Sequence, residues 1–213
     1  MQTDDEQLEA LKRWWKEYGR SVVLGVVLGG AIAGGAWWWM EQQERQAESA
    51  SMAYQSMLHD LEQGEYARVM EQGQGLIGEY SRSAYAGLAA LAVARAAVAQ
   101  DELDVARAQL AWAADNARTD EARTLARLHL ARLLLDAGEH QEALARLEGE
   151  VADPLRPAFD EARGDVYLAM GERAQARQAY AAALEGVEGR PSQLLQMKYD
   201  DVADAATQED AAS

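Results

Sequence analysis

The sequence predicts an all-α protein, in which an N-terminal transmembrane helix is followed by a domain of stacked helix pairs, an α-solenoid. Three observations lead to this fold class. The composition is rich in helix-forming residues and contains only three prolines. Residues 21–40 form an uncharged, largely apolar segment. After this segment, short turn-like sequences recur at nearly constant intervals, which is typical of helical-repeat proteins.

The composition also restricts the function. Phenylalanine occurs once and β-branched residues are sparse beyond the first forty positions, which disfavours an all-β fold. The net charge is −16, and about −15 of it falls on residues 41–213. A surface this acidic repels phosphate groups, which argues against nucleic acid as a partner and against a face lying on anionic lipid. The chain has no cysteine, so disulfides and thiolate chemistry are excluded.

The segment at residues 21–40 has the length and composition of a membrane span. Twenty helical residues extend for about 30 Å, which matches the hydrocarbon core of a bilayer. Tryptophan and tyrosine prefer the headgroup region, and they flank this segment on both sides. The flanking aromatic residues are Trp14, Trp15, Tyr18, Trp37, Trp38 and Trp39. We therefore expect a single transmembrane helix at residues 21–40.

The distribution of basic residues predicts the orientation of this helix. Lys12, Arg13, Lys16 and Arg20 precede it, whereas Arg45 is the one basic residue in the twenty positions that follow. The positive-inside rule then places residues 1–20 in the cytoplasm as a short tail and exports the remainder. The apolar segment is longer than that of a usual signal peptide, so we expect an uncleaved signal-anchor. The predicted location is the bacterial inner membrane, with the C-terminal domain in the periplasm.

Glycines of the predicted span recur at four-residue intervals, which places them on one helix face. A face of small residues permits close approach of another membrane helix. Glycine is also simply common in membrane helices, and the sequence leaves both interpretations open. The candidate contact face consists of Gly25, Gly29, Gly30 and Gly34.

Residues 41–202 are predicted to form the repeat domain. A helix with an amphipathic pattern is expected to run without interruption to a turn at Gly64. Similar turns follow at Asp101, Gly138 and Gly171, and each turn position is followed by a glutamate. These glutamates are 37, 37 and 33 residues apart. A helix–turn–helix unit with a period near 34 predicts tetratricopeptide-like repeats.

Residue size around the turn positions supports the repeats. Small residues are expected where paired helices touch, and large residues where they fill the space between units. Small residues occur seven before and five after the turns, at Ala94, Ala131, Gly164, Ala106, Ala143 and Ala176. Large residues occur nine after, at Leu110, Leu147 and Tyr180.

The ends of the repeat domain depart from this pattern. In the first unit Val69 takes a small position, and its second helix is expected to be short because Gly73, Gly75 and Gly78 are poor helix formers. We therefore predict three repeats after an imperfect leading one. Residues 193–202 are expected to form a capping helix, and residues 203–213 a disordered polar tail.

Three short stretches carry a resemblance to a known family: EALKRWW at residues 9–15, ASMAYQ at residues 50–55 and QMK at residues 196–198. They resemble the YfgM-like family of ancillary SecYEG translocon subunits. The resemblance implies an inner-membrane protein with a periplasmic tetratricopeptide domain. It also implies association with the SecYEG translocon and with the periplasmic foldase PpiD, in the handover of exported client proteins. The family further has a suggested link to envelope stress signalling.

No catalytic motif is evident. His59, His129 and His140 fall on three different predicted helices and offer no metal-ligand set. Residues 73–78 match a G-x-G-x-x-G pattern in letters, but no strand precedes them. We therefore predict a non-enzymatic scaffold without cofactor, metal or small-molecule substrate. The alternative is an envelope stress-signalling or assembly adaptor that binds a regulatory protein through its repeats.

The predicted partner-binding surface is the first helix of each repeat, because these helices line the concave face of a tetratricopeptide stack. Positions six and ten residues before each turn share one helix face. They are occupied by Leu91, Arg95, Leu128, Arg132, Glu161 and Asp165. Arginines beside leucines suit an extended or helical segment that carries an acidic group and an apolar anchor. The alternative is that the leucines belong to the core and the arginines pair with local carboxylates.

Overall fold

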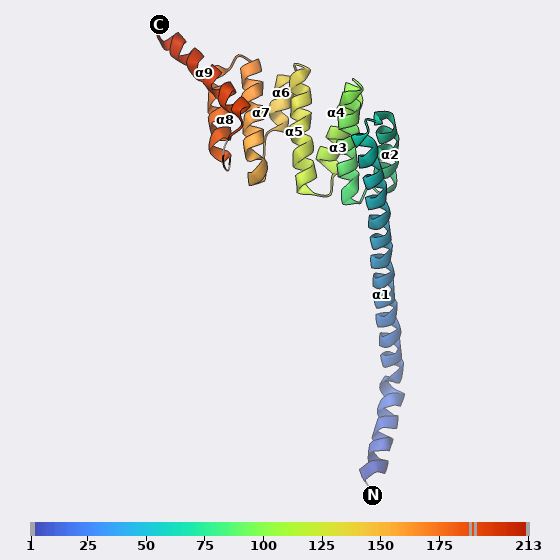
Figure 1. The fold of residues 1–213 in the computed structure, drawn as a ribbon. Helices are drawn as coiled ribbons and strands as arrows, with labels where there is room; N and C mark the ends of the chain where they lie inside the picture. Colours follow the sequence, from blue (N-terminus) through green and yellow to red (C-terminus); the bar gives the residue numbers. More distant parts are fainter. Residues whose placement is uncertain (1–2, 188, 190, 212–213) are drawn as a thin grey trace. The chain divides into compact units, whose positions relative to one another are not determined.

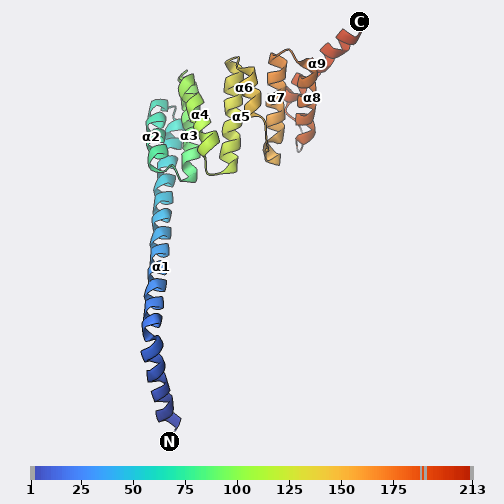
Figure 2. The same ribbon diagram turned by 180° about the vertical axis from the view of Figure 1, so that it is seen from behind.

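The computed structural model describes residues 3–187, 189 and 191–211, and these residues are helical apart from short connections (Figures 1 and 2). The helices are α1 (Thr3–Glu62), α2 (Tyr66–Glu79), α3 (Ala84–Ala99), α4 (Leu103–Asn116), α5 (Asp120–Asp136), α6 (His140–Arg146), α7 (Arg156–Ala169), α8 (Arg173–Gly186) and α9 (Gln193–Ala211). A 3₁₀ turn at Asp153–Leu155 precedes α7. The all-α prediction is confirmed for these residues.

The chain divides into two compact units, Met1–Ser49 and Ala50–Ser213. In the first unit, α1 is helical from Thr3 onward and includes the predicted span. No helix among the described residues is long and apolar enough to cross a membrane. The side chains at positions 21, 22, 24, 26, 27 and 31 of the predicted span lie outside the described ones.

The four glycines of the candidate contact face lie on helical backbone and are exposed. A Cβ atom added at any of Gly25, Gly29, Gly30 or Gly34 would have no neighbour within 4 Å. The backbone is therefore open to close approach at these positions. Whether another helix uses this face stays a prediction.

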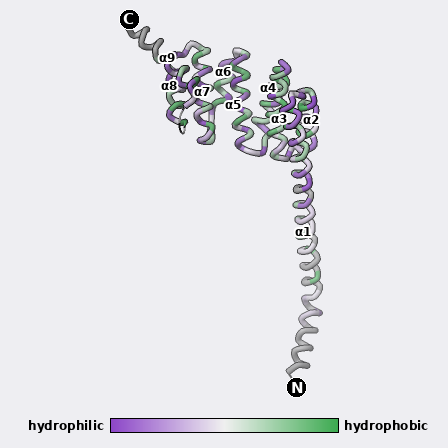
Figure 3. The backbone as a smooth tube through the Cα atoms, viewed as in Figure 1, coloured by the Kyte–Doolittle hydropathy of each residue, from purple (hydrophilic) through white to green (hydrophobic). Residues whose placement is uncertain are grey.

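In the second unit, successive helices form antiparallel pairs that stand side by side: the end of α1 with α2, then α3 with α4, α5 with α6, and α7 with α8 (Figure 1). Hydrophilic and hydrophobic residues alternate along these helices, as expected where one side of each helix is buried (Figure 3). The core is divided along the row of helices: one cluster of buried residues runs from α3 to α7, and others lie between α1, α2 and α3 and between α8 and α9.

All four predicted turns share one geometry. Gly64, Asp101, Gly138 and Gly171 have φ between 62° and 80°, which is the left-handed region. The next residue, a glutamate each time, donates its N–H to the carbonyl five residues earlier, at 2.8–2.9 Å. This is the Schellman arrangement, in which otherwise unpaired carbonyls at a helix end are satisfied. The same glutamate is the N-cap of the following helix.

The predicted small and large positions pack against each other. Ala106, Ala143, Ala176, Leu147 and Tyr180 are completely buried. At Gly164 an added Cβ would lie 2.4 Å from Cε1 of Tyr180, so the tyrosine ring occupies the space that a side chain would need. The α7–α8 pair thus places a small residue opposite a large one, as the residue-size pattern predicted.

The first helix pair, formed by the end of α1 and α2, reverses this arrangement. The large residue Met57 takes the position of Ala94 or Gly164, and Gly73 takes the position of Leu110 or Tyr180. A Cβ at Gly73 would lie 3.3 Å from Sδ of Met57 and 2.1 Å from Cγ2 of Val93. The prediction of a short second helix is wrong, because α2 has 14 residues. Gly73 serves packing against α1 and α3, and this burial offsets its low helix propensity.

The short second helix lies instead in the third pair, where α6 has seven residues. The connection after it is held by the side chain of Arg127. Its guanidinium donates to the carbonyls of Arg146, Glu148 and Glu150, and its Cζ lies 5.4 Å from the ring centre of Phe159. Arg163 adds a 2.7 Å hydrogen bond to the carbonyl of Leu147. Arginine side chains therefore satisfy the carbonyls that a longer helix would have paired.

The final helix is longer than expected. Leu195 and Val202 of α9 are buried against the last pair, in agreement with a capping helix. The helix continues to Ala211, where a disordered tail from residue 203 was predicted. Residues 203–211 contain four alanines and no glycine or proline, so nothing in the sequence ends the helix there. Residues 212–213 lie outside the described ones.

Candidate partner-binding groove

The first helices of three successive pairs enclose an open groove of about 520 Å³ within the second unit. The end of α1 contributes one side, α3 and α5 contribute most of the rest, and Leu110 of α4 completes the lining. Its lining is mostly apolar. The lining residues are Tyr54, Leu58, Leu61, Leu88, Leu91, Ala92, Ala94, Arg95, Val98, Leu110, Leu125, His129, Arg132, Leu133 and Asp136.

Three of the six predicted partner-binding residues meet in this groove: Leu91, Arg95 and Arg132. Both arginines are exposed, and neither forms a hydrogen bond or an ion pair with any residue that the structure describes. Other arginines of the domain do pair with carboxylates; Arg163, for example, lies 2.5 Å from Asp160. Among the described residues, Arg95 and Arg132 therefore do not pair with local carboxylates, in contrast to what the alternative interpretation expected.

The other three predicted residues lie elsewhere. Leu128 is 2% exposed and belongs to the core, where it packs with residues of α3, α4 and α7. Glu161 and Asp165 both accept hydrogen bonds from Nζ of Lys198, at 2.8 and 2.9 Å. Because Lys198 lies on α9, the capping helix covers the positions that correspond to Leu91 and Arg95.

The contacts around Lys198 form a closed polar network. The hydroxyl of Tyr180 donates to Oδ1 of Asp165 at 2.8 Å. Burial raises the pKa of the tyrosine, and this hydrogen bond raises it further. Burial lowers the pKa of Lys198, but its hydrogen bonds to Asp165 and Glu161 outweigh burial, and the net shift is upward. The lysine is therefore held charged, and the network fixes α9 on the last helix pair.

The repeat pattern could have located further groove residues. Tyr54 and Leu58 occur ten and six residues before the turn at Gly64, at the offsets that identified Leu91 and Arg95. Leu88 and Leu125 each occur thirteen residues before a turn, which places them on the same helix face. The leading helix pair departs from the residue-size pattern at Val69, but its groove positions follow the same offsets as those of the later pairs.

His129 lies on α5 and lines the groove, as Arg132 does. Burial lowers the pKa of His129, and the positive charge of Arg132 lowers it further. The histidine is thus uncharged at neutral pH. An acidic group placed here would favour its protonated form, since an opposite charge stabilises the imidazolium.

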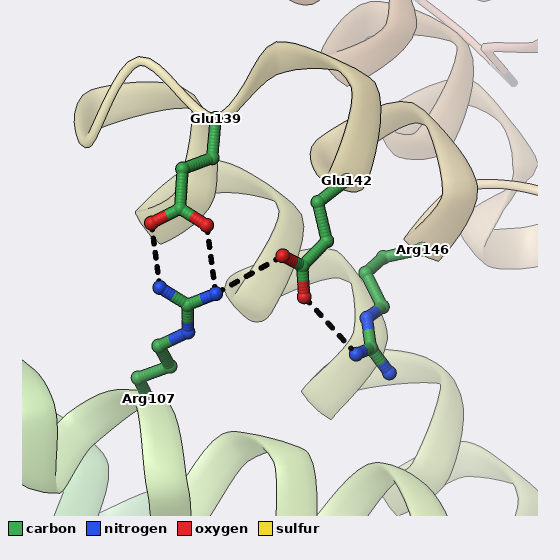
Figure 4. A network of polar contacts seen from close by, with 4 residues as sticks. All are labelled: Arg107, Glu139, Glu142 and Arg146. Atoms are coloured by element: carbon green, nitrogen blue, oxygen red, sulfur yellow. Dashed lines mark hydrogen bonds and ion pairs between the residues drawn. The ribbon is translucent and has the colours of Figure 1, made fainter.

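A second set of charged residues joins the second helices of two successive pairs (Figure 4). Arg107 on α4 donates to both carboxylate oxygens of Glu139, at 2.6 and 2.7 Å, and to Glu142 at 3.1 Å. Glu142 in turn accepts from Arg146 at 3.3 Å. The hydrogen bond between Arg107 and Glu139 raises the pKa of the arginine and lowers that of the glutamate. This bidentate contact connects two successive helix pairs. It does not involve Arg95 or Arg132 of the groove.

Within the described part of the chain, no three histidine or carboxylate side chains are grouped in a way that could hold a metal ion. The chemistry of the groove is that of a binding surface: apolar contact area, two cationic donors and a neutral imidazole.

Comparison with known proteins agrees with this architecture. A family model described as tetratricopeptide repeat-like domain matches residues 12–204. A relative from Escherichia coli (strain K12), named ancillary SecYEG translocon subunit, is 28% identical and covers 95% of this chain and 98% of its own length. Relatives of the same name from Haemophilus influenzae and Neisseria gonorrhoeae are 24% and 25% identical, over 93% and 92% of this chain and 97% and 96% of their own lengths.

No solved structure matches the chain significantly. The relatives confirm the resemblance to the YfgM-like family, and both their name and the repeat domain describe a non-catalytic kind of protein. The match of the family model over most of the sequence shows that this chain belongs to the tetratricopeptide repeat-like domain family.

Proposed function

We propose that this protein is a non-enzymatic, membrane-anchored scaffold that associates with the Sec translocon and with a periplasmic foldase, and that it assists the handover of exported proteins. The observation that carries the proposal is the open groove, which offers apolar surface and two arginines that have no carboxylate partner among the described residues. Relatives named as translocon subunits match over nearly the full chain. Repeat stacks of this kind bind segments of other proteins along such faces.

The anchor proposed for this function is the segment at residues 21–40. Its lack of charge, its aromatic flanks and the basic residues before it support a span with residues 1–20 in the cytoplasm and the repeat domain in the periplasm. Confinement to the membrane of the translocon raises the effective concentration of the scaffold, so weak contacts are sufficient. The glycine face of Gly25, Gly29, Gly30 and Gly34 is proposed as the contact with a partner helix.

Site-specific photocrosslinking in native membranes tests this function. A photoreactive residue is placed at Leu91 in the groove, at Gly29 on the glycine face, and at Gln178 on the exposed side of α8 as a control position. We expect translocon and foldase subunits from the first two positions and not from the third. Recovery of a stress regulator in their place would favour the signalling adaptor and count against the scaffold.

A co-purification experiment gives independent information. The intact protein is extracted in mild detergent, and its partners are identified by mass spectrometry. Translocon subunits recovered in constant proportion to the protein would support the association. Their absence, under conditions in which the translocon itself stays assembled, would contradict it.

A further inference from the structure

The groove is asymmetric across its three helices. Its α1 side is formed by Tyr54, Leu58 and Leu61, none of which carries a charge. Its opposite side, on α5, carries Arg132 and His129. Arg95 lies on α3, the helix between α1 and α5. The sequence analysis predicted arginines beside leucines on two first helices, and the structure adds the apolar side that α1 contributes.

The arginines are unusual in their surroundings. Acidic residues greatly outnumber basic ones in residues 41–213, yet Arg95 and Arg132 have no ion pair among the described residues. The carboxylate in the groove lining is Asp136, which follows Arg132 by one helical turn. Two unpaired guanidinium groups beside apolar surface leave the groove locally complementary to an acidic group.

The groove also sets a length for its occupant. Packed helices lie about 8–10 Å apart, so crossing from α1 over α3 to α5 takes roughly 20 Å. An extended chain covers about 3.3 Å per residue, and roughly six residues would span the groove. A segment of this length can place an apolar side chain at one end and acidic side chains at the other.

We propose that the groove binds an acidic, amphipathic segment of a partner protein, with an apolar anchor against Tyr54 and Leu58 and carboxylates on Arg95 and Arg132. This inference rests on the proposed scaffold function and deepens it by naming the chemistry of the partner. The apolar end lies against α1 and the acidic end against α5. A segment with lysines in place of the acids would face two arginines and be repelled.

Binding of fluorescent peptides to the full chain in detergent tests the proposal. The probes are an extended peptide with two leucines followed by two glutamates, and the same peptide with lysines in place of the glutamates. We expect measurable binding of the acidic peptide, steep weakening by salt, and no binding of the lysine peptide. The combined Arg95→Glu and Arg132→Glu variant should weaken binding by tenfold or more, since it replaces attraction with repulsion at both ends of the basic surface.

A matched control keeps the interpretation clear. Arg118→Glu with Arg177→Glu makes the same change in net charge at two exposed positions outside the groove lining, and should leave binding unchanged. A second variant, Leu58→Gln, should weaken the acidic peptide without restoring the lysine peptide. Circular dichroism confirms that each variant remains helical.

Equal weakening by the groove and control variants, or equal binding of both peptides, would overturn the proposal. Co-purification of translocon subunits is measured with the same variants. If that co-purification persists while peptide binding fails throughout, the scaffold function stands and the partner chemistry assigned to the groove is wrong. If peptide binding follows the groove variants but no translocon subunit is recovered, the groove assignment stands and the scaffold function fails.

Discussion

At the residue scale, Asp101 is the exception among the four turns. It adopts φ of 62°, in the region where the other three turns place glycine. A side chain in this region costs about 1–2 kcal/mol for most residues, and somewhat less for aspartate, whose short polar side chain tolerates it. The turn forms nevertheless, because the surrounding helices and the hydrogen bond from Glu102 determine its conformation.

Replacing Asp101 with glycine should therefore stabilise the domain by up to about 1 kcal/mol, since the strain of the side chain is removed. Chemical denaturation followed by circular dichroism measures the change. Gly138→Ala is the complementary variant and should destabilise by about 1 kcal/mol, because φ of 78° is unfavourable for alanine. A loss of stability in Asp101→Gly would contradict this prediction and indicate that the carboxylate of Asp101 stabilises the domain through another interaction.

His129 makes stability depend on pH. Burial and the charge of Arg132 lower its pKa in the folded chain, so the unfolded chain binds a proton more readily. The stabilisation that neutral His129 contributes is complete above the pKa of an unfolded histidine, about 6.5. It declines as the pH falls through that pKa. The free energy of unfolding at pH 5.5 and 7.5 should therefore differ more for the wild type than for His129→Gln. An unchanged difference in the variant would contradict this assignment.

At the scale of helix pairs, one small and one large residue determine how closely two helices approach. The ring of Tyr180 fills the space where Gly164 would carry a Cβ. In the α3–α4 and α5–α6 pairs the corresponding residues are an alanine and a leucine, Ala94 with Leu110 and Ala131 with Leu147, and all four are buried in one cluster. The volume at these contacts is conserved by changing both partners together, as close packing requires.

Gly164→Ala should consequently destabilise the last pair by about 1–3 kcal/mol through overpacking. Tyr180→Leu should also destabilise, because it leaves a cavity and removes the hydrogen bond to Asp165. The double variant has the alanine and leucine that occupy these positions in the α3–α4 and α5–α6 pairs, and should lose less stability than the sum of both changes. A double-mutant cycle from urea denaturation measures this coupling. Strict additivity would mean that the two positions do not share the contact.

At the scale of the whole molecule, the proposed anchor yields a prediction of its own. Leu28→Arg combined with Ile32→Arg places two charges in the middle of the apolar segment, and each costs about 2.5–3.5 kcal/mol in a membrane helix. The wild type should stay in the membrane fraction after alkaline carbonate treatment, and the variant should be released. Ala47→Arg with Glu48→Arg, beyond the predicted span, serves as the control and should remain membrane-bound. Release of the wild type would contradict the anchor.

Most of the fold could be predicted because its signals are local. The turns at Gly64, Gly138 and Gly171 combine a residue that relieves backbone strain with a helix N-cap, and both act within a few residues of chain. The lengths of α2 and α6 could not be predicted in this way. Gly73 is tolerated in α2 because it packs against Val93. The short α6 is followed by carbonyls that the side chain of Arg127 satisfies. The lengths of both helices therefore depend on residues distant in sequence.

The candidate groove likewise has a part that could be predicted from the sequence and a part that could not. The sequence by itself determined which residues share the inner face of each first helix, since helical periodicity is a property of one segment. Only the tertiary structure decided which of them remain open. Leu128 is covered by the core, Glu161 and Asp165 are covered by Lys198 of α9, and Leu91, Arg95 and Arg132 stay accessible beside Tyr54 and Leu58. The physical reason is that burial and ion pairing depend on which helices pack together, and those contacts join residues far apart in the chain.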